Sequence, residues 1–139
     1  MSGLKIELIQ PGQLSPWAKN ARTHSKKQLK QIAESIRTFG FTNPVLIDAG
    51  DTILAGHGRV EAAKMIGMAQ VPCVRLEHMT PEQKRAYVLA DNKLALNAGW
   101  DDEILADELK ALMEADIDFD VEITGFSVAE IDSLVEGLS

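Results

Sequence analysis

The sequence predicts an α/β chain of the α+β type, in which a small mixed sheet with flanking helices is followed by a helical C-terminal extension. Short apolar runs of strand length are found before residue 80, where they alternate with helical patterns. The last 60 residues hold helical patterns instead. With 139 residues, 45% hydrophobic content and 25% charged content, the chain is long and apolar enough for one globular core.

Four runs predict the strands of the sheet. Lys5–Ile9 alternates polar and apolar residues and ends at a Pro-Gly break. Val45–Ile47 and Thr52–Ala55 flank a short turn that contains a glycine, which is typical of a hairpin. Val71–Leu76 is the last predicted strand, and it contains the single cysteine, Cys73. One cysteine cannot form an internal disulfide, and its apolar neighbours favour a buried structural thiol.

Capping patterns mark the beginnings of the two longest predicted helices. Ser25 followed by Gln28 is a capping-box pattern, and apolar residues then recur at helical spacing until Gly40. Thr80-Pro81-Glu82-Gln83 gives a similar signal for a helix that extends to about Leu96. Apolar residues occur around this second helix, so we expect it to be covered on more than one side.

We divide the chain into a core and a helical extension on these patterns. The core comprises residues 1–79, and the extension comprises residues 80–139. Within the extension we expect one helix over residues 80–96 and two acidic helices over residues 101–114 and 127–136.

The charge is distributed unevenly along the chain. Residues 1–90 hold 12 Lys+Arg and 7 Asp+Glu, a net charge of +5, whereas residues 91–139 hold 2 and 14, a net charge of −12. A polyanion is therefore attracted to the first part and repelled by the second. Lys26, Lys30 and Arg37 share the polar face of the first helix, where they are either nucleic-acid contacts or an ordinary solvated surface.

Two absences complete the picture from composition. No helix-turn-helix DNA reader is recognisable, so sequence-specific DNA recognition is not expected. Neither a signal peptide nor an apolar stretch of membrane-spanning length is found, so we expect a cytoplasmic protein without a membrane partner.

The segment Ala55–Arg59, which reads AGHGR, joins the hairpin to a short helix that is expected to end at Gly67. Glycine lets the backbone approach a ligand closely, and free amides at the start of a helix point outward. Arginine adds a forked cation. The segment therefore suits a phosphate group, although a glycine turn between a strand and a helix is equally often only a turn.

The polar triplet Asp91-Asn92-Lys93 lies inside the helix that we expect to be largely covered. Polar groups in such a place need hydrogen-bonding or charged partners. Neighbouring backbone groups, a metal ion or a ligand would each supply them, and the triplet alone does not choose among these.

Several motifs occur in an order that resembles the ParB N-terminal domain family, whose superfamily includes sulfiredoxin and a free-serine kinase. The resemblance extends over about residues 4–96 and is carried by Asn20-Ala21-Arg22, Ser35–Gly40, Asn43-Pro44-Val45, Ala55–Arg59 and Val71-Pro72. It implies the small mixed sheet of that family.

A narrower resemblance is to the ParB-like segment that precedes the catalytic domain of phage and bacterial adenine-N6 or cytosine-N4 DNA methyltransferases. It is carried by Phe41–Ile47, Ala55–Arg59, Arg85-Ala86-Tyr87, Ala90–Ala95 and Asn97–Asp101. The catalytic quartet and the cofactor loop of a methylase are not found in the sequence, so we do not expect this chain alone to methylate DNA.

The resemblance implies a nucleoside triphosphate, CTP or ATP, bound with Mg²⁺. In partition proteins of the family the equivalent turn is Gly-Glu-Arg-Arg and holds the triphosphate of CTP. Carried over by position, Asp91 faces Mg²⁺, and the phosphate-binding residues are Arg22, Gly56, His57, Gly58, Arg59, Asn92 and Lys93. His57 also replaces the catalytic cysteine of sulfiredoxin, so sulfinic-acid reduction is not expected. His57 is then either a general base or phosphate contact, or a packed and hydrogen-bonded residue.

Our leading hypothesis is a nucleotide-associated or DNA-associated module of a DNA-modification or partition system, with at most weak nucleotide hydrolysis. DNA or a DNA-methyltransferase domain is the expected partner, and a homodimer is compatible with the pattern. Two alternatives stay open. One is a ParB-like nuclease or small-molecule kinase, and the other is a ligand-free protein or DNA interaction domain whose acidic tail docks a protein.

Overall fold

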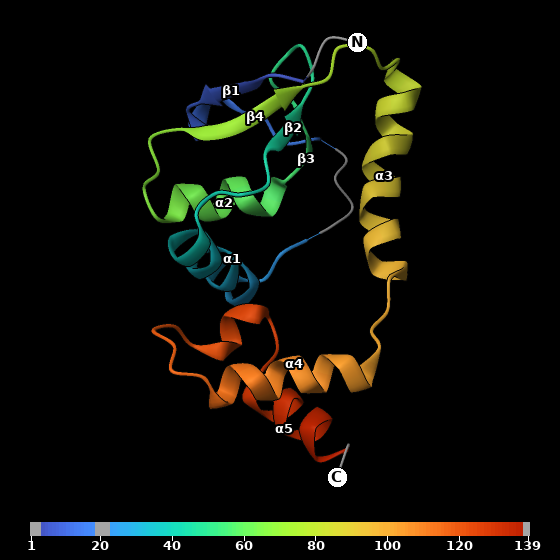
Figure 1. Ribbon diagram of the computed structural model, residues 1–139. Coiled ribbons are helices and arrows are strands. Elements are labelled where there is room, and N and C mark those ends of the chain that lie inside the picture. The colour runs from blue at the N-terminus through green and yellow to red at the C-terminus, as the bar shows by residue number, and fades with distance from the viewer. Residues whose placement is uncertain (1–3, 19–22, 138–139) are drawn as a thin grey trace. The chain divides into compact units, whose positions relative to one another are not determined.

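The computed structural model, which describes residues 4–18 and 23–137, contains one mixed sheet of four short strands (Figure 1). They are β1 (Ile6–Ile9), β2 (Val45–Ile47), β3 (Ile53–Ala55) and β4 (Val71–Arg75), in the order β1-β4-β2-β3. Strand β4 is antiparallel to β1 and parallel to β2, while β2 and β3 form the predicted hairpin. The predicted fold class is confirmed.

Three helices accompany the sheet: α1 (Lys26–Phe39), α2 (His57–Met65) and α3 (Pro81–Asn97), with a short 3-10 turn, η1 (Pro11–Gln13), after β1. The capping box of α1 is present, because Ser25 Oγ accepts from the Gln28 amide at 3.1 Å and Gln28 Oε1 accepts from the Ser25 amide at 3.2 Å. The same reciprocal pair begins α3 at Thr80 and Gln83. These local signals were sufficient to predict both helix starts.

The sheet is covered by apolar side chains on both of its faces. On one face, the strand residues Val45, Ile47 and Cys73 form a buried cluster with Val60 and Ala63 of α2. On the other face, a second cluster unites β3, β4 and α3 through Leu54, Val74, Leu76 and Val88. Helix α2 is therefore fixed between the sheet and α1, whereas α3 lies along the opposite face (Figure 1).

Helix α3 is covered on one side and exposed on the others. Val88 is 3% exposed, whereas Leu89, Leu94 and Leu96 are each more than half exposed. The expectation that this helix is covered on more than one side is therefore wrong for the described chain. Apolar residues around a helix indicate its composition, but they do not supply a neighbouring element to cover each side.

The chain forms two compact units, Met1–Asn97 and Ala98–Ser139. The second contains α4 (Asp102–Glu114), the 3-10 turn η2 (Val121–Thr124) and α5 (Val128–Glu136). The boundary between the units falls after α3, because α3 packs on the sheet through its Val88 cluster. The boundary expected from the sequence was after residue 79. Trp100 and Phe126 form an edge-to-face pair within the second unit, with ring centroids 5.4 Å apart.

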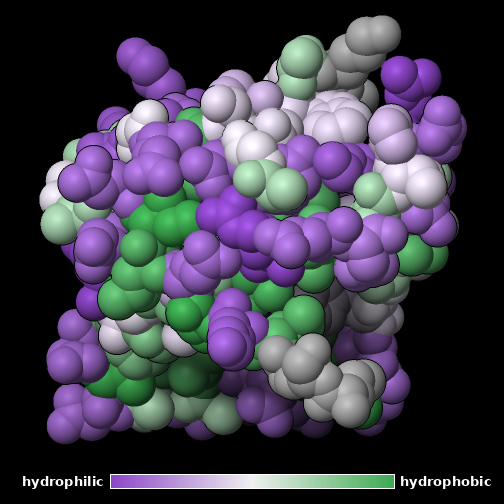
Figure 2. Space-filling view, turned by 90° about the horizontal axis from the view of Figure 1, so that it is seen from above, coloured by the Kyte–Doolittle hydropathy of each residue, from purple (hydrophilic) through white to green (hydrophobic). Residues whose placement is uncertain are grey.

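Apolar side chains also remain exposed at the edge of the sheet. Leu4, Ile6 and Leu8 are each more than half exposed on or just before β1. Figure 2 looks onto this end of the first unit and shows hydrophobic side chains at the surface between hydrophilic ones. None of the described helices has the length and apolar character that a membrane span requires.

Candidate functional site

The AGHGR segment forms a sharp turn from β3 into α2. Gly56 has a φ of +104°, a left-handed conformation that residues with a Cβ rarely adopt. A Cβ at this position would also lie 3.0 Å from the Arg59 Nη2. The Val60 amide donates to the Gly56 carbonyl at 3.0 Å, so the helix begins immediately after the turn. The amides of residues 57–59 precede the first intrahelical donor and are available to a ligand.

A pocket of about 350 Å³ opens at this turn. It lies within the first unit and brings the turn together with α3, although the two segments are more than 30 residues apart in the sequence. Its lining combines apolar side chains with the predicted polar residues, namely His24, Ile32, Leu54, Ala55, Gly56, His57, Gly58, Arg59, Asp91, Asn92 and Ala95.

Arg59 is the cation of this pocket. Its Nη2 donates to the Pro44 carbonyl at 3.1 Å, which ties the turn to the entry of β2. Its Nε atom is buried and has no hydrogen-bond partner in the described chain. Burial lowers the pKa of Arg59, and the nearby Asp91 charge opposes that effect. Because an arginine stays charged at physiological pH, the pocket holds a partly buried cation whose buried Nε donor is unused.

His57 is held as a neutral imidazole. Its Nε2 accepts a hydrogen bond from the Trp17 amide at 3.0 Å, so the ring proton is on Nδ1. Burial lowers the pKa of His57, and the neighbouring His24 lowers it further, while Glu61 acts in the opposite direction. The Nε2 lone pair is therefore used by the backbone, and Nδ1–H is the donor that a ligand could meet. A catalytic role for His57 stays a prediction.

Gly58 permits His24 to approach the turn. A Cβ at position 58 would lie 3.0 Å from both Cε1 and Nε2 of His24 and 3.1 Å from Cδ1 of Ile32. Any side chain there would displace one of these neighbours. Close packing against His24, which precedes α1, and against Ile32 of α1 explains the second glycine of the turn. Access of a ligand to the backbone is a second reason for a glycine there.

Helix α3 supplies the polar residues on the opposite wall. Asp91 and Asn92 both line the pocket, and the Asn92 side-chain amide also donates to the Val88 carbonyl at 3.0 Å. The backbone of α3 therefore satisfies the side-chain NH2 group of Asn92. The side-chain oxygen of Asn92 takes no part in that hydrogen bond. Lys93 is exposed and does not line the pocket.

The remaining predicted residues are Arg22 and three cations of α1. Arg22 is outside the described residues. Lys26, Lys30 and Arg37 are exposed on α1, and Arg37 forms an ion pair with Glu34 on the same helix. These α1 cations do not line the pocket at the turn.

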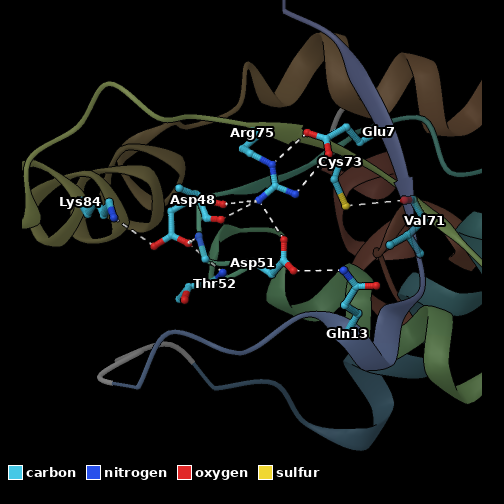
Figure 3. A network of polar contacts seen from close by, with 11 residues as sticks. Glu7, Gln13, Asp48, Asp51, Thr52, Val71, Cys73, Arg75 and Lys84 are labelled. Atoms are coloured by element: carbon cyan, nitrogen blue, oxygen red, sulfur yellow. Dashed lines mark hydrogen bonds and ion pairs between the residues drawn. The ribbon is translucent and has the colours of Figure 1, made fainter.

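A polar network occupies the tip of the β2–β3 hairpin (Figure 3). Arg75 of β4 donates to both carboxylate oxygens of Glu7, at 3.0 and 3.2 Å, and lies 2.9 Å from Asp51 Oδ1. Asp48 is buried, accepts from the Gly50 and Thr52 amides, and pairs with Lys84 of α3 at 3.1 Å. The hairpin acids are therefore used by the fold and lie apart from the pocket lining.

The network also sets the protonation of its members. Burial alone would raise the pKa of Asp48, but hydrogen bonds from Thr52, Lys84 and Gly50 lower it overall. Hydrogen bonds from Gln13 and Arg75 lower the pKa of Asp51. Asp48 is consequently a carboxylate that stabilises the hairpin and one end of α3.

Sequence reasoning missed His24 as a pocket residue and Lys84 as an anchor of α3. His24 also lines an adjoining, more apolar pocket of about 330 Å³, together with Leu14, Pro16, Leu29, Ile53, His57, Glu61 and Lys64. The close approach to Gly58 is the feature that brings His24 into the site. No local pattern signals it, because the two residues are 34 positions apart.

Comparisons with known proteins agree with this fold. Residues 1–93 match the model of the ParB N-terminal domain, and residues 103–138 match that of the ParB-methyltransferase HTH domain. The chain is 55% identical over 82 residues to the ParB-like nuclease domain-containing protein YnaK of Escherichia coli strain K12. That alignment covers 59% of this chain and 94% of YnaK.

Two solved structures share the fold. The C-terminally truncated chromosome-partitioning protein ParB from Caulobacter crescentus, complexed with CTP-γ-S, has a TM-score of 0.67 and 25% identity, covering 79% of this chain and 63% of that one. Sulfiredoxin from Arabidopsis thaliana has a TM-score of 0.50 and 21% identity, covering 60% of this chain and 97% of that one, and shows the fold alone.

The match over residues 103–138 corrects one expectation. No helix-turn-helix segment was expected from the sequence, yet this match identifies one across α4 and α5. The acidic composition concealed it, because DNA-reading segments are normally recognised with the help of their basic residues.

Proposed function

Because this chain belongs to the ParB N-terminal domain family, we propose that the pocket at the AGHGR turn binds a nucleoside triphosphate with Mg²⁺, CTP being the first candidate. The observation that carries the proposal is the buried Arg59 Nε without a partner in a pocket that also contains a left-handed glycine turn. A phosphate oxygen is the acceptor that such a site suits best. The Caulobacter relative in complex with CTP-γ-S supports the choice of nucleotide.

The two walls of the pocket have different roles in this proposal: the turn binds phosphate, and α3 binds the metal. On the turn, the free amides and Arg59 bind phosphate oxygens, and the Nδ1–H of His57 is a further donor. On α3, Asn92 offers an amide oxygen and Asp91 a carboxylate, which suits a hard divalent cation. Mg²⁺ held in this way usually keeps phosphate and water oxygens as its other ligands, and it would neutralise phosphate charge beside Asp91.

Calorimetric titration of the full chain with CTP, ATP, GTP and S-adenosylmethionine in the presence of Mg²⁺ tests the proposal. We expect heat with at least one nucleotide and none with S-adenosylmethionine. Arg59→Ala should weaken binding by roughly 30- to 100-fold, the value of a charge-assisted pair of hydrogen bonds. Arg85→Ala, an exposed arginine of α3 outside the pocket, is the matched control and should bind normally.

The nucleotide hypothesis fails if no nucleotide binds, or if Arg59→Ala binds as well as the control. Circular dichroism of Arg59→Ala is needed beside the titration, because Arg59 also holds the Pro44 carbonyl. Arg59→Lys separates charge from fork geometry. It keeps the charge but loses the two-pronged donor, so it should recover only part of the affinity.

Asp91→Asn tests the metal separately from the nucleotide. With wild-type protein, EDTA should weaken nucleotide binding, because phosphate then meets the bare Asp91 carboxylate. In Asp91→Asn that repulsion is gone, so affinity should depend much less on Mg²⁺. Equal sensitivity to EDTA in both proteins would remove Asp91 from the metal site.

We further propose that this module serves DNA modification, with a methyltransferase domain or DNA as its partner. The match of residues 103–138 to a ParB-methyltransferase HTH domain supports the first partner. The exposed Lys26 and Lys30 of α1 support the second. Substituting both by glutamine should weaken any DNA complex and reduce its salt dependence by about two phosphate contacts, whereas an unchanged salt slope would exclude this face.

A nuclease is the second candidate function, favoured by the 55% identity to a ParB-like nuclease domain-containing protein. Metal nucleases normally collect several carboxylates around their metal. In the described residues no group of three or more metal-binding side chains is found, and Asp48 and Asp51 are engaged by Lys84 and Arg75. Plasmid cleavage with Mg²⁺ or Mn²⁺ that persists in Asp91→Ala would indicate a contaminant, whereas cleavage lost in that variant would support the nuclease.

A further inference from the structure

The second unit is strongly acidic for a helix-turn-helix segment. Residues 98–139 hold 13 Asp+Glu and one lysine, Lys110, a net charge of −12. Helix α5 contains Glu130, Asp132 and Glu136 and neither lysine nor arginine. A helix that enters a DNA groove approaches phosphates on both sides, and a protein gains most of that affinity by neutralising them. Neither α4 nor α5 has the cations to do so.

An apolar pocket of about 240 Å³ lies between the end of α4, η2 and α5. Its walls include Met113 and Val128, which are about half exposed, and its floor includes the buried Ile131. Three carboxylates, Asp120, Glu122 and Asp132, also line it. Asp120 Oδ1 accepts a hydrogen bond from the Glu122 amide. In the described part of the chain, the Asp132 carboxylate takes part in no hydrogen bond or ion pair.

We propose that this pocket docks a basic amphipathic segment of a partner protein and that the second unit does not read DNA. An apolar side chain of the segment fills the pocket, while its lysines or arginines reach the surrounding carboxylates. Charge complementarity favours this occupant, because the second unit, with a net charge of −12, attracts a cationic peptide and repels a nucleic acid. A basic helix with apolar residues on one face satisfies both requirements at once.

Two-dimensional amide NMR of the full 139-residue chain provides the test, because it assigns binding to one unit or the other. The first probe is a 15-residue peptide of lysine and leucine at helical spacing, and its control is the same peptide with glutamate in place of lysine. We expect shifts at Met113, Val128 and Ile131 with the lysine peptide and none with the glutamate peptide. The second probe is a 20-base-pair DNA duplex, which should leave α4 and α5 unshifted.

Matched variants separate a pocket from general charge attraction. Met113→Ser removes an apolar wall that is half exposed, and Asp132→Asn removes one carboxylate of the pocket. Each substitution should lower the affinity for the lysine peptide by at least roughly tenfold. Asp107→Asn removes an equal charge from the exposed part of α4 outside the pocket and should have less than a threefold effect.

Three results would overturn the proposal: no shifts with the lysine peptide, equal losses in Asp107→Asn and Asp132→Asn, or duplex-induced shifts along α5. The test is independent of the nucleotide pocket, which lies in the first unit.

Discussion

Replacing Lys84 by methionine should loosen one end of α3. We expect it to lower nucleotide affinity as well, although Lys84 does not line the pocket. Lys84 Nζ lies 3.1 Å from Asp48 Oδ2, and the two side chains are 23% and 10% exposed. The pair ties α3 to the hairpin tip. Asp91 follows Lys84 by seven residues, or about 10 Å along the helix. Any shift of this anchor is therefore transmitted through two helical turns to the wall of the pocket that contains Asp91.

The cost of Lys84→Met in unfolding free energy depends on which interactions Asp48 retains. After Lys84→Met, the Asp48 carboxylate still accepts from the Gly50 and Thr52 amides, both at 2.9 Å, but it loses its ion pair with Lys84. A buried charged hydrogen bond of this kind contributes about 1.5–3 kcal/mol. Because Lys84 is one quarter exposed, we expect the lower end, a loss of about 1–2 kcal/mol in the free energy of unfolding.

Urea unfolding measured through tryptophan fluorescence checks this value. The Trp100→Phe background keeps an aromatic ring beside Phe126 and leaves Trp17 as the probe of the first unit. A double-mutant cycle of Lys84→Met and Asp48→Asn should give a coupling energy of about 1 kcal/mol, and nucleotide affinity should fall roughly tenfold. Single-variant effects that add within about 0.3 kcal/mol would refute the reasoning, as would an unchanged affinity.

Three further predictions concern protonation, the turn and the core. Stability should decrease as the pH falls below 6.5, because the unfolded His57 imidazole takes up a proton while the folded one, with its lowered pKa, does not until lower pH. Urea midpoints of wild type and His57→Gln at pH 7.5, 6.5 and 5.5 measure this, and an identical pH dependence in both would contradict it. Gly58→Ala should cost up to about 2 kcal/mol, because overpacking against His24 exceeds the gain in helix propensity. Gly12→Ala, which meets no atom within 4 Å, is its control, and equal stability of the two would argue against the clash. Leu54→Ala should cost about 3–5 kcal/mol by thermal or urea unfolding, whereas the exposed Leu94→Ala should change stability by less than about 0.5 kcal/mol.

Local signals explain why the elements of the fold were predictable. The capping boxes at Ser25 and Thr80 use residues three positions apart, so both helix starts follow directly from the sequence. The left-handed Gly56 is also a local requirement, since the turn from β3 into α2 demands it. Local reasoning singled out Asp91 and Asn92 as polar residues in need of partners, but only the family resemblance paired them with the turn, because Asp91 and Gly56 are separated by 35 residues.

Features that depend on tertiary packing were not accessible to the same reasoning. Helical periodicity placed Leu89 and Leu94 on apolar faces of α3 but could not show that both side chains are more than half exposed. The acids Asp48 and Asp51 could be named from the sequence, whereas their pairing with Lys84 and Arg75 required the fold. The helix-turn-helix segment was missed because its composition is acidic where such segments are usually basic.

The two walls of the pocket differ in how firmly they are held. The turn is fixed on several sides, because Arg59 bonds the entry of β2, His57 bonds the Trp17 amide and Gly58 is buried beside His24. Helix α3 is held mainly by the Val88 cluster and by the ion pair between Lys84 and Asp48. A ligand that bridges Arg59 and Asp91 must therefore spend part of its binding energy on ordering α3. Affinity then depends on the stability of the α3 anchor as well as on the phosphate contacts, which is why a remote lysine is the most informative residue to replace.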